Sequence, residues 1–181
     1  ERIDRLSSQQ HEMLKIASIE GEVFTAEVIE KILGIDVGSA IRHLSGELDK
    51  QHQLVEGQGR QRLGPQRISR YRFKHILFQR DLYYHLDEIE REYLHEAVGN
   101  QLEQFYEEQI NEISVELAWH FEQAGLVAKA IGYLQQAGNR AVSVSANEEA
   151  ITHFTKGLEL LETTPENLER DRQELALQIA L

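Results

Sequence analysis

The spacing between apolar residues changes twice along this chain of 181 residues, and these changes restrict the folds open to it. In the N-terminal part, apolar side chains recur every three or four positions, as on one face of a helix. Over Arg70–Lys74 they alternate with polar side chains, which is the period of a strand. From Ile76 to the C-terminus the helical spacing returns. We therefore expect a mainly α protein in which one β-hairpin stands between two helical regions.

Three short helices are predicted before the hairpin. The first begins at Ser7–Gln10, which has the residue types and spacing of a capping box, and ends at Gly21, a candidate for a left-handed cap. The second begins after Thr25, its expected N-cap residue, and ends at Gly34. The third is expected over residues 39–50, where the apolar residues again have helical spacing.

The predicted hairpin follows the third helix. Its strands are expected at Gln53–Glu56 and Arg70–Lys74, with a stretch rich in glycine and polar residues between them. Three helices followed by a hairpin are the element order of a winged helix. We therefore predict a winged-helix domain over residues 1–85.

Only helices are predicted beyond the hairpin. A joint is expected at Leu86–Glu88, where Asp87 is a good N-cap residue. We expect residues 86–110 to form a connecting helix and residues 111–181 to form a separate helical domain.

Two stretches of the C-terminal region share a pattern of one small, one large and one small residue. They are Ala130–Ala137, centred on Leu134, and Ala150–Gly157, centred on Phe154. Small residues let a neighbouring helix approach closely, and the large residue fills the groove between the helices. Antiparallel helix pairs pack in this way, so we predict that residues 111–181 begin a tetratricopeptide-like array.

Charge is distributed unevenly along the chain. The sequence has 19 Lys and Arg against 31 Asp and Glu, a net charge of −12. Between Gly57 and Arg80, however, there are seven basic residues and no acidic residue. Such an acidic chain is a poor nonspecific ligand for nucleic acid or for an anionic membrane.

The basic segment raises the question of a DNA-binding wing, because arginines of such hairpins can contact phosphates. The predicted third helix argues against this, since it carries Glu47 and Asp49 beside Arg42, His43 and Lys50. DNA is therefore not the expected partner. The alternatives are a solvated hairpin rich in arginine and an anionic partner within the same molecule.

No catalytic signature is found in the sequence. It has no phosphate-binding loop, no H-E-x-x-H motif and no G-x-S-x-G motif, and it has no cysteine. The acid and histidine pairs Asp81/His85 and Glu116/His120 have helical i,i+4 spacing, and we expect them to be solvated pairs rather than metal ligands. We therefore expect no enzyme activity, no catalytic residue, no metal site and no cofactor held by this segment alone.

The ends of the chain and its hydropathy give two further expectations. No run of apolar residues is long enough for a membrane span, and the N-terminus has no signal-peptide core, so a cytoplasmic protein without a membrane partner is expected. The sequence starts without Met and stops inside an apolar periodic run, so we expect it to be a piece of a larger protein.

Several stretches of the chain carry a distinctive order of residues. Tyr71–Tyr83 reads Y-R-F-K-H-I-L-F-Q-R-D-L-Y, and Ser114–Gly125 reads S-V-E-L-A-W-H-F-E-Q-A-G. Ala128–Tyr133, Ala146–Ile151 and Arg170–Leu177 continue the series. In their order and spacing, these stretches resemble the region that follows the nucleotide-binding domain in STAND-type signalling ATPases.

This resemblance implies a regulatory and interaction role without catalysis. In such bacterial signalling proteins, an upstream P-loop domain binds ATP or ADP, and a cyclase, protein kinase or DNA-binding domain gives the output. The winged helix would relay the nucleotide state in partnership with that upstream domain. The helical repeats would bind a protein or small-molecule effector.

The resemblance also points to one candidate site residue. His75 matches a histidine that contacts the ADP β-phosphate in the off state of related switches, although this chain reads Lys74-His75-Ile76 where they read Met-His-Asp. Arg72 and Lys74 are expected to raise the positive potential around it. Two other roles are open for His75: it caps the helix starting at Ile76, or it packs beneath the hairpin. For the whole chain, the alternative is a winged-helix transcription regulator with a helical effector or oligomerisation domain.

Overall fold

The computed structural model describes residues 6–181, which are mainly helical with one small antiparallel sheet. The chain forms two compact units, one ending at Phe105 and the other running from Tyr106 to Leu181. The predicted helical class and the presence of a hairpin are confirmed. The hairpin strands are longer than predicted, because the stretch rich in glycine and polar residues pairs as strand up to Leu63 opposite Gln66. The predicted domain boundaries after residues 85 and 110 stay predictions, because a compact unit need not coincide with a functional domain. None of the helices in the described part of the chain is both long and apolar enough to span a membrane.

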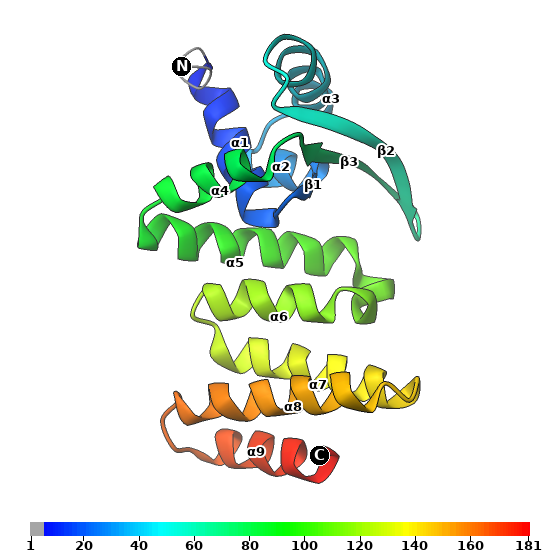
Figure 1. Cartoon of the computed structure of the whole chain (residues 1–181), viewed down its shortest axis with the longest axis vertical. Coiled ribbons are helices and arrows are strands. Elements are labelled where there is room, and N and C mark those ends of the chain that lie inside the picture. Colours follow the sequence, from blue (N-terminus) through cyan, green and yellow to red (C-terminus); the bar gives the residue numbers. More distant parts are fainter. Residues whose placement is uncertain (1–5) are drawn as a thin grey trace. The chain divides into compact units, whose positions relative to one another are not determined.

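In the first unit, three helical segments and the strands of the sheet precede two further helices along the chain (Figure 1). Its elements are α1 (Ser8–Glu20), β1 (Val23–Thr25), α2 (Ala26–Leu33), α3 (Val37–Arg42), the π-helix η2 (His43–Gln51), β2 (Val55–Leu63), β3 (Gln66–Phe73), α4 (Ile76–His85) and α5 (Glu88–Phe105). Strand β1 was not predicted from the sequence, because three residues are too few to show an alternating pattern.

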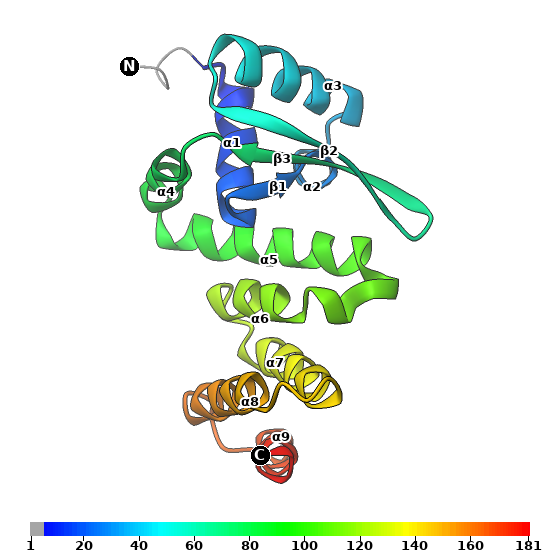
Figure 2. The ribbon, with the colours of Figure 1, turned by 45° about the vertical axis from the view of Figure 1, so that its right-hand side comes forward.

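The sheet has the order β1-β3-β2, and both pairings are antiparallel. Strand β1 pairs only with Arg70–Arg72 of β3, whereas β2 and β3 pair from Val55 opposite Phe73 to Leu63 opposite Gln66. The far end of the hairpin is therefore a two-stranded ribbon without a third strand, and it extends beyond the rest of the sheet (Figures 1 and 2). A register shift at Gly57/Gly59 bends β2 where this ribbon begins.

Several helix ends are confirmed at the predicted residues. At the start of α1, the Gln10 N–H donates to Ser7 Oγ at 3.2 Å, and the Ser7 N–H donates to Gln10 Oε1 at 2.9 Å. Gly34 ends α2 in the left-handed conformation, and the Glu90 N–H donates to Asp87 Oδ1 at 2.9 Å after the joint between α4 and α5. Local side-chain chemistry is thus sufficient to fix these ends.

Two other predicted caps are confirmed in position but differ in geometry. Gly21 has a φ of 133° and a ψ of −155°, so it is not left-handed helical, although glycine is still the residue that adopts this conformation readily. Thr25 precedes α2 but makes no side-chain cap hydrogen bond. Its hydroxyl donates to Glu20 Oε1 at 2.6 Å and its N–H donates to Glu20 Oε2 at 2.9 Å. The buried Glu20 carboxylate accepts both of these hydrogen bonds, so the Thr25 hydroxyl does not cap α2.

The third helical segment starts earlier than predicted and changes its winding. Asp36 caps it by accepting from the Ser39 N–H at 2.8 Å, so α3 begins at Val37 rather than near residue 39. From His43 the chain continues as the π-helix η2. Leu44 and Leu48 are fully buried, as the apolar spacing indicated. Four-residue spacing does not distinguish an α-helix from a π-helix over so short a segment.

The interior of the first unit is built around aromatic rings. Phe24 of β1 lies with its ring centroid 5.1 Å from that of Phe73 and 6.0 Å from that of Tyr71. The Tyr71 hydroxyl is hydrogen bonded to Ser45 Oγ at 2.7 Å, which links the sheet to η2. Lys15 of α1 forms an ion pair with Glu90 of α5 at 2.8 Å. The sheet, η2 and α5 are thereby attached to the same core.

The second unit consists of helices that each pack on the next one along the chain (Figure 1). Its elements are the 3-10 segment η3 (Glu107–Glu112), α6 (Ser114–Gln123), α7 (Val127–Ser143), α8 (Asn147–Glu162) and α9 (Leu168–Ala180). The short connections between α6, α7 and α8 require antiparallel neighbours. The segment η3 was not predicted, because it has no buried residue and hence no apolar pattern.

The small residues singled out in the sequence lie in the interior of the second unit. They are Ala130, Ala137, Ala150 and Gly157, and all four are buried. A further small residue, Gly138, was overlooked. A Cβ atom at Gly138 would overlap the Phe154 ring, and one at Gly157 would lie 3.0 Å from Leu177 Cδ1. The close approach of α7 to α8 and of α8 to α9 therefore depends on missing side chains.

Candidate functional site

The candidate site lies where β3 passes into α4. Phe73 ends the strand inside the core, and its ring meets that of Phe78 edge-on with the centroids 6.0 Å apart. Gln79 Nε2 donates to the Ser18 carbonyl oxygen at 2.6 Å, which attaches α4 to α1. The two residues between strand and helix, Lys74 and His75, are thus held between well-packed segments.

His75 is exposed at this junction. Its carbonyl oxygen accepts from the Phe78 N–H at 3.0 Å, so its backbone occupies the N-cap position of α4. Its imidazole makes no cap hydrogen bond. His75 is therefore the N-cap residue of α4, as one alternative had it, although through its backbone and not its imidazole. The other alternative is wrong, because the exposed side chain does not pack beneath the hairpin. A contact with ADP phosphate stays a prediction.

The two cations next to His75 are each held by a carboxylate. Arg72 donates from Nε to Glu56 Oε1 at 3.1 Å, across the β2–β3 pair. Lys74 Nζ lies 2.8 Å from Asp49 Oδ1 of η2. The expected rise in positive potential around His75 is therefore largely offset, because each neighbouring charge has a partner within ion-pair distance. Among Arg72, Lys74 and His75, the His75 imidazole is therefore the side chain that is available to bind a ligand.

A second cluster lies between α4 and α5. The Tyr83 hydroxyl is hydrogen bonded to His95 Nε2 at 3.0 Å, and the Arg91 guanidinium lies over the Tyr83 ring, 5.2 Å from its centroid. His95 is fully buried, and this burial, together with the nearby Arg91 charge, lowers the pKa of its imidazole to about 4. Burial also raises the pKa of the Tyr83 phenol. At neutral pH the pair is an uncharged hydrogen bond inside the unit.

This cluster was not predicted from the sequence, although a signal was present. His95 lies three and seven residues before Val98 and Leu102, on the same helical face as these buried side chains. A histidine within an apolar stripe predicts a neutral, buried imidazole.

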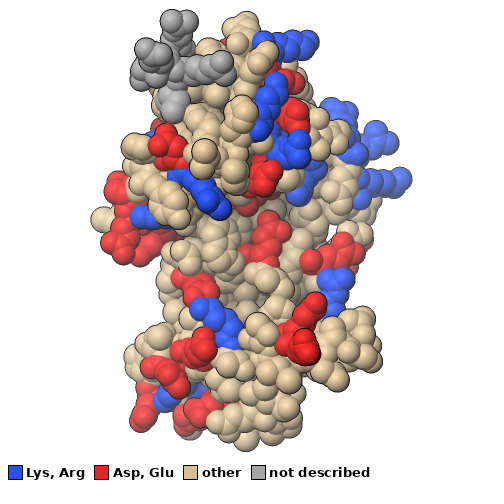
Figure 3. Space-filling view, in the orientation of Figure 1, with Lys and Arg blue, Asp and Glu red and all other residues tan. Residues whose placement is uncertain are grey.

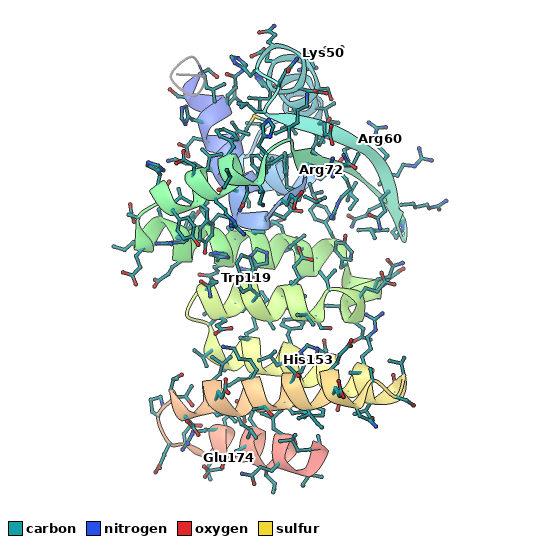
Figure 4. All side chains as sticks on the ribbon, viewed as in Figure 1. Lys50, Arg60, Arg72, Trp119, His153 and Glu174 are labelled. Carbon is teal, nitrogen blue, oxygen red and sulfur yellow. The ribbon has the colours of Figure 1, made fainter. Side chains whose placement is uncertain are left out.

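The basic hairpin forms a third group. The register places Arg62 directly opposite Arg67, with Arg60 two positions along β2 on the same face. These side chains and Gln61 line an open recess of about 250 Å³. Figure 3 shows blue side chains gathered over the hairpin, and Figure 4 shows Arg60 extending from β2.

The acid and histidine pairs differ from one another. His85 Nδ1 lies 3.4 Å from Asp81 Oδ1, and both side chains are at least half exposed, which confirms a solvated pair. His120, in contrast, is fully buried, so the expectation of a solvated pair with Glu116 is wrong. It lies beside Leu117 and Phe121 on the face of α6 that packs in the interior. Within residues 6–181, no three His, Asp or Glu side chains gather as they would around a metal ion.

No protein-family model, curated protein or solved structure that was compared matches this chain.

Proposed function

We propose that this chain is a non-catalytic regulatory and interaction segment of a STAND-type signalling ATPase that is switched by nucleotide. The observation that carries the proposal is the position of His75. The stretch that resembles the family's histidine motif passes from a buried strand to the start of α4 and leaves an exposed imidazole at that junction.

The architecture supports a winged helix in the first unit. Its order of helix, strand, two helical segments and hairpin is the order that a winged helix has. In the second unit, antiparallel helices pack each on the next through small residues, which supports a tetratricopeptide-like array. Apolar side chains left exposed on its helices, among them Trp119 and Ile151, would offer an effector a contact surface.

The proposed role of His75 follows from its surroundings. An imidazole that donates an N–H, or is protonated, makes a charge-assisted hydrogen bond to phosphate. Arg72 and Lys74 are already paired with Glu56 and Asp49, so His75 would be the donor left for a β-phosphate presented by an upstream nucleotide-binding domain. Because that bond would exist only in the closed state, it would favour the off state.

The first test is the coding sequence upstream of Glu1, where a P-loop with the pattern G-x-x-x-x-G-K-[ST] would support the class. The second is the ADP dissociation rate of the full-length protein. Loss of a charge-assisted bond worth ~1.5–3 kcal/mol in His75→Ala should speed ADP release about ten- to a hundredfold and raise basal output.

The matched control is His85→Ala, which removes another exposed helix-end histidine. It should leave the ADP dissociation rate unchanged. Neither variant should change the melting temperature of the present chain, because neither imidazole is buried. An unchanged ADP dissociation rate in His75→Ala would remove the proposed sensor role.

The alternative function is a winged-helix transcription regulator that reads a DNA sequence. It would require α3 and η2 to present positive side chains to a groove. Lys74 is paired with Asp49, while Glu47 accepts from Gln10 and lies 3.5 Å from His43. These acidic side chains on η2 do not favour base reading, so the regulator stays the second candidate.

A further inference from the structure

The ribbon at the end of the β2–β3 hairpin contributes little to the sheet but carries a distinct chemistry. Beyond the register shift at Gly57/Gly59, the strands pair only with each other and close through a tight turn at Gly64, which has a φ of 53°. Of the exposed side chains between Gly57 and Gln66, none is acidic and none is a large apolar one.

One face of this ribbon is an arginine surface, defined here as Arg60, Arg62 and Arg67. Arg62 and Arg67 are directly opposite each other, and like charges in this position destabilise a strand pair. Arg62 Nε donates to the Gly64 carbonyl oxygen at 3.0 Å, which holds that guanidinium near the turn. None of the three arginines forms an ion pair with a carboxylate of the described residues. Their positive charge is therefore available to an anionic ligand.

The composition of the ribbon distinguishes between classes of anionic partner. Protein interfaces are anchored by buried aromatic and apolar side chains. The ribbon exposes none, and in the described residues before Ile76 no large apolar side chain is exposed. Its remaining exposed polar side chains are the amides of Gln58, Gln61 and Gln66, which can donate to phosphate oxygens. The planar guanidinium fork matches phosphate geometry, and a two-stranded ribbon fits a nucleic-acid groove.

We propose that the arginine surface binds the phosphate backbone of duplex nucleic acid, without reading its sequence. The acidic side chains on η2 explain why base reading is not part of the proposal. The acidic net charge, which makes the whole chain a poor ligand for nucleic acid, confines binding to this surface and predicts that it is weak. Its salt dependence is set by the few phosphate groups that the three arginines neutralise. This inference does not rest on the proposed nucleotide switch, and its test involves no nucleotide.

The test is fluorescence anisotropy of a labelled mixed-sequence duplex, titrated with the whole chain between about 20 and 200 mM salt. The wild type should bind at the lowest salt. Arg60→Gln/Arg67→Gln should weaken binding at least about tenfold and reduce the salt slope by about 0.9 for each phosphate group that the variant no longer neutralises.

The matched control is Lys31→Gln/Arg172→Gln, which changes the net charge equally at two exposed cations outside the hairpin. Its affinity should stay within about twofold of the wild type. Equal losses in the two double variants would overturn the proposal, since only total charge would then matter. Absence of duplex binding by the wild type would also overturn it. So would tighter binding of a polyglutamate peptide than of the duplex, with loss of peptide binding in the hairpin variant, because the partner would then be an acidic protein. Cooperative melting of all three proteins, with no large loss of melting temperature in either double variant, establishes that the fold is kept.

Discussion

In the unit that ends at Phe105, aromatic rings and a buried imidazole fill the interior, with Phe24 at its centre. In the unit that begins at Tyr106, the closest helix contacts occur where a side chain is missing, as at Gly138 beside Phe154. Large buried side chains fill both interiors, among them Phe121 and Phe154 in the second unit, but at Gly138 and Gly157 a helix contact of the second unit also requires that a side chain is missing. The same kind of substitution should have different effects in the two units.

The largest effect is expected from removing volume in the first unit. Phe24→Ala deletes a fully buried ring that contacts Tyr71 and Phe73, and such truncations cost ~3–5 kcal/mol. Chemical denaturation followed by circular dichroism should show this loss. Phe24→Leu, which keeps most of the volume, should lose much less. Equal losses would mean that volume is not what Phe24 supplies.

The next effect is a pH dependence located at His95. Its pKa is lowered to about 4 in the fold, against ~6.5 for an unperturbed histidine, so protonation favours the unfolded chain. The stabilisation is complete above pH ~6.5 and is lost as the pH falls toward 4, by about 3 kcal/mol in total. Across this range, the free energy of unfolding of the wild type should fall by about 3 kcal/mol relative to that of His95→Gln, which does not titrate. If the free energies of unfolding of the two proteins changed in parallel with pH, His95 would not be a buried neutral imidazole.

A smaller effect is expected from adding volume in the second unit. Gly138→Ala places a Cβ against the buried Phe154 ring, and overpacking of this kind costs ~1–3 kcal/mol. Gly132 lies in the same helix, and a Cβ there meets no atom within 4 Å. Gly132→Ala should therefore stabilise the chain by ~0.5–1 kcal/mol through helix propensity alone. If both substitutions shifted the melting temperature in the same direction, the contact of Gly138 with Phe154 would not limit the packing of α7 on α8.

The smallest effect lies outside both interiors, on the hairpin. Arg67→Gln removes the like charge opposite Arg62, which should raise stability by ~0.2–1 kcal/mol. Arg72→Gln removes a half-exposed ion pair with Glu56 and should lower stability by at most ~1 kcal/mol. Denaturation midpoints at low and high salt measure both changes. The two shifts should have opposite signs at low salt and shrink at high salt.

Features set by neighbouring residues were predictable from the sequence. The capping box at Ser7–Gln10, the left-handed Gly34 and the joint at Asp87 each depend on a few residues in a row. The short strand β1 was not predictable, because its three residues form a strand only through pairing with β3. The His95 cluster required knowing that α4 lies against α5. Likewise, the pairing of Arg72 and Lys74 on either side of the junction with His75 depended on carboxylates from β2 and η2.

The pairing of β1 with β3 has a consequence for the order of folding. Val23 lies opposite Arg72, so the chain must close a loop of nearly fifty residues before this strand pair can form. Strands β2 and β3 are joined by a tight turn, and in the second unit each helix packs mainly on its neighbour in the sequence. Contacts between sequence neighbours form faster than contacts across long loops. The hairpin and the helix pairs of the second unit should thus become protected from hydrogen exchange early in refolding, and β1 should be protected last.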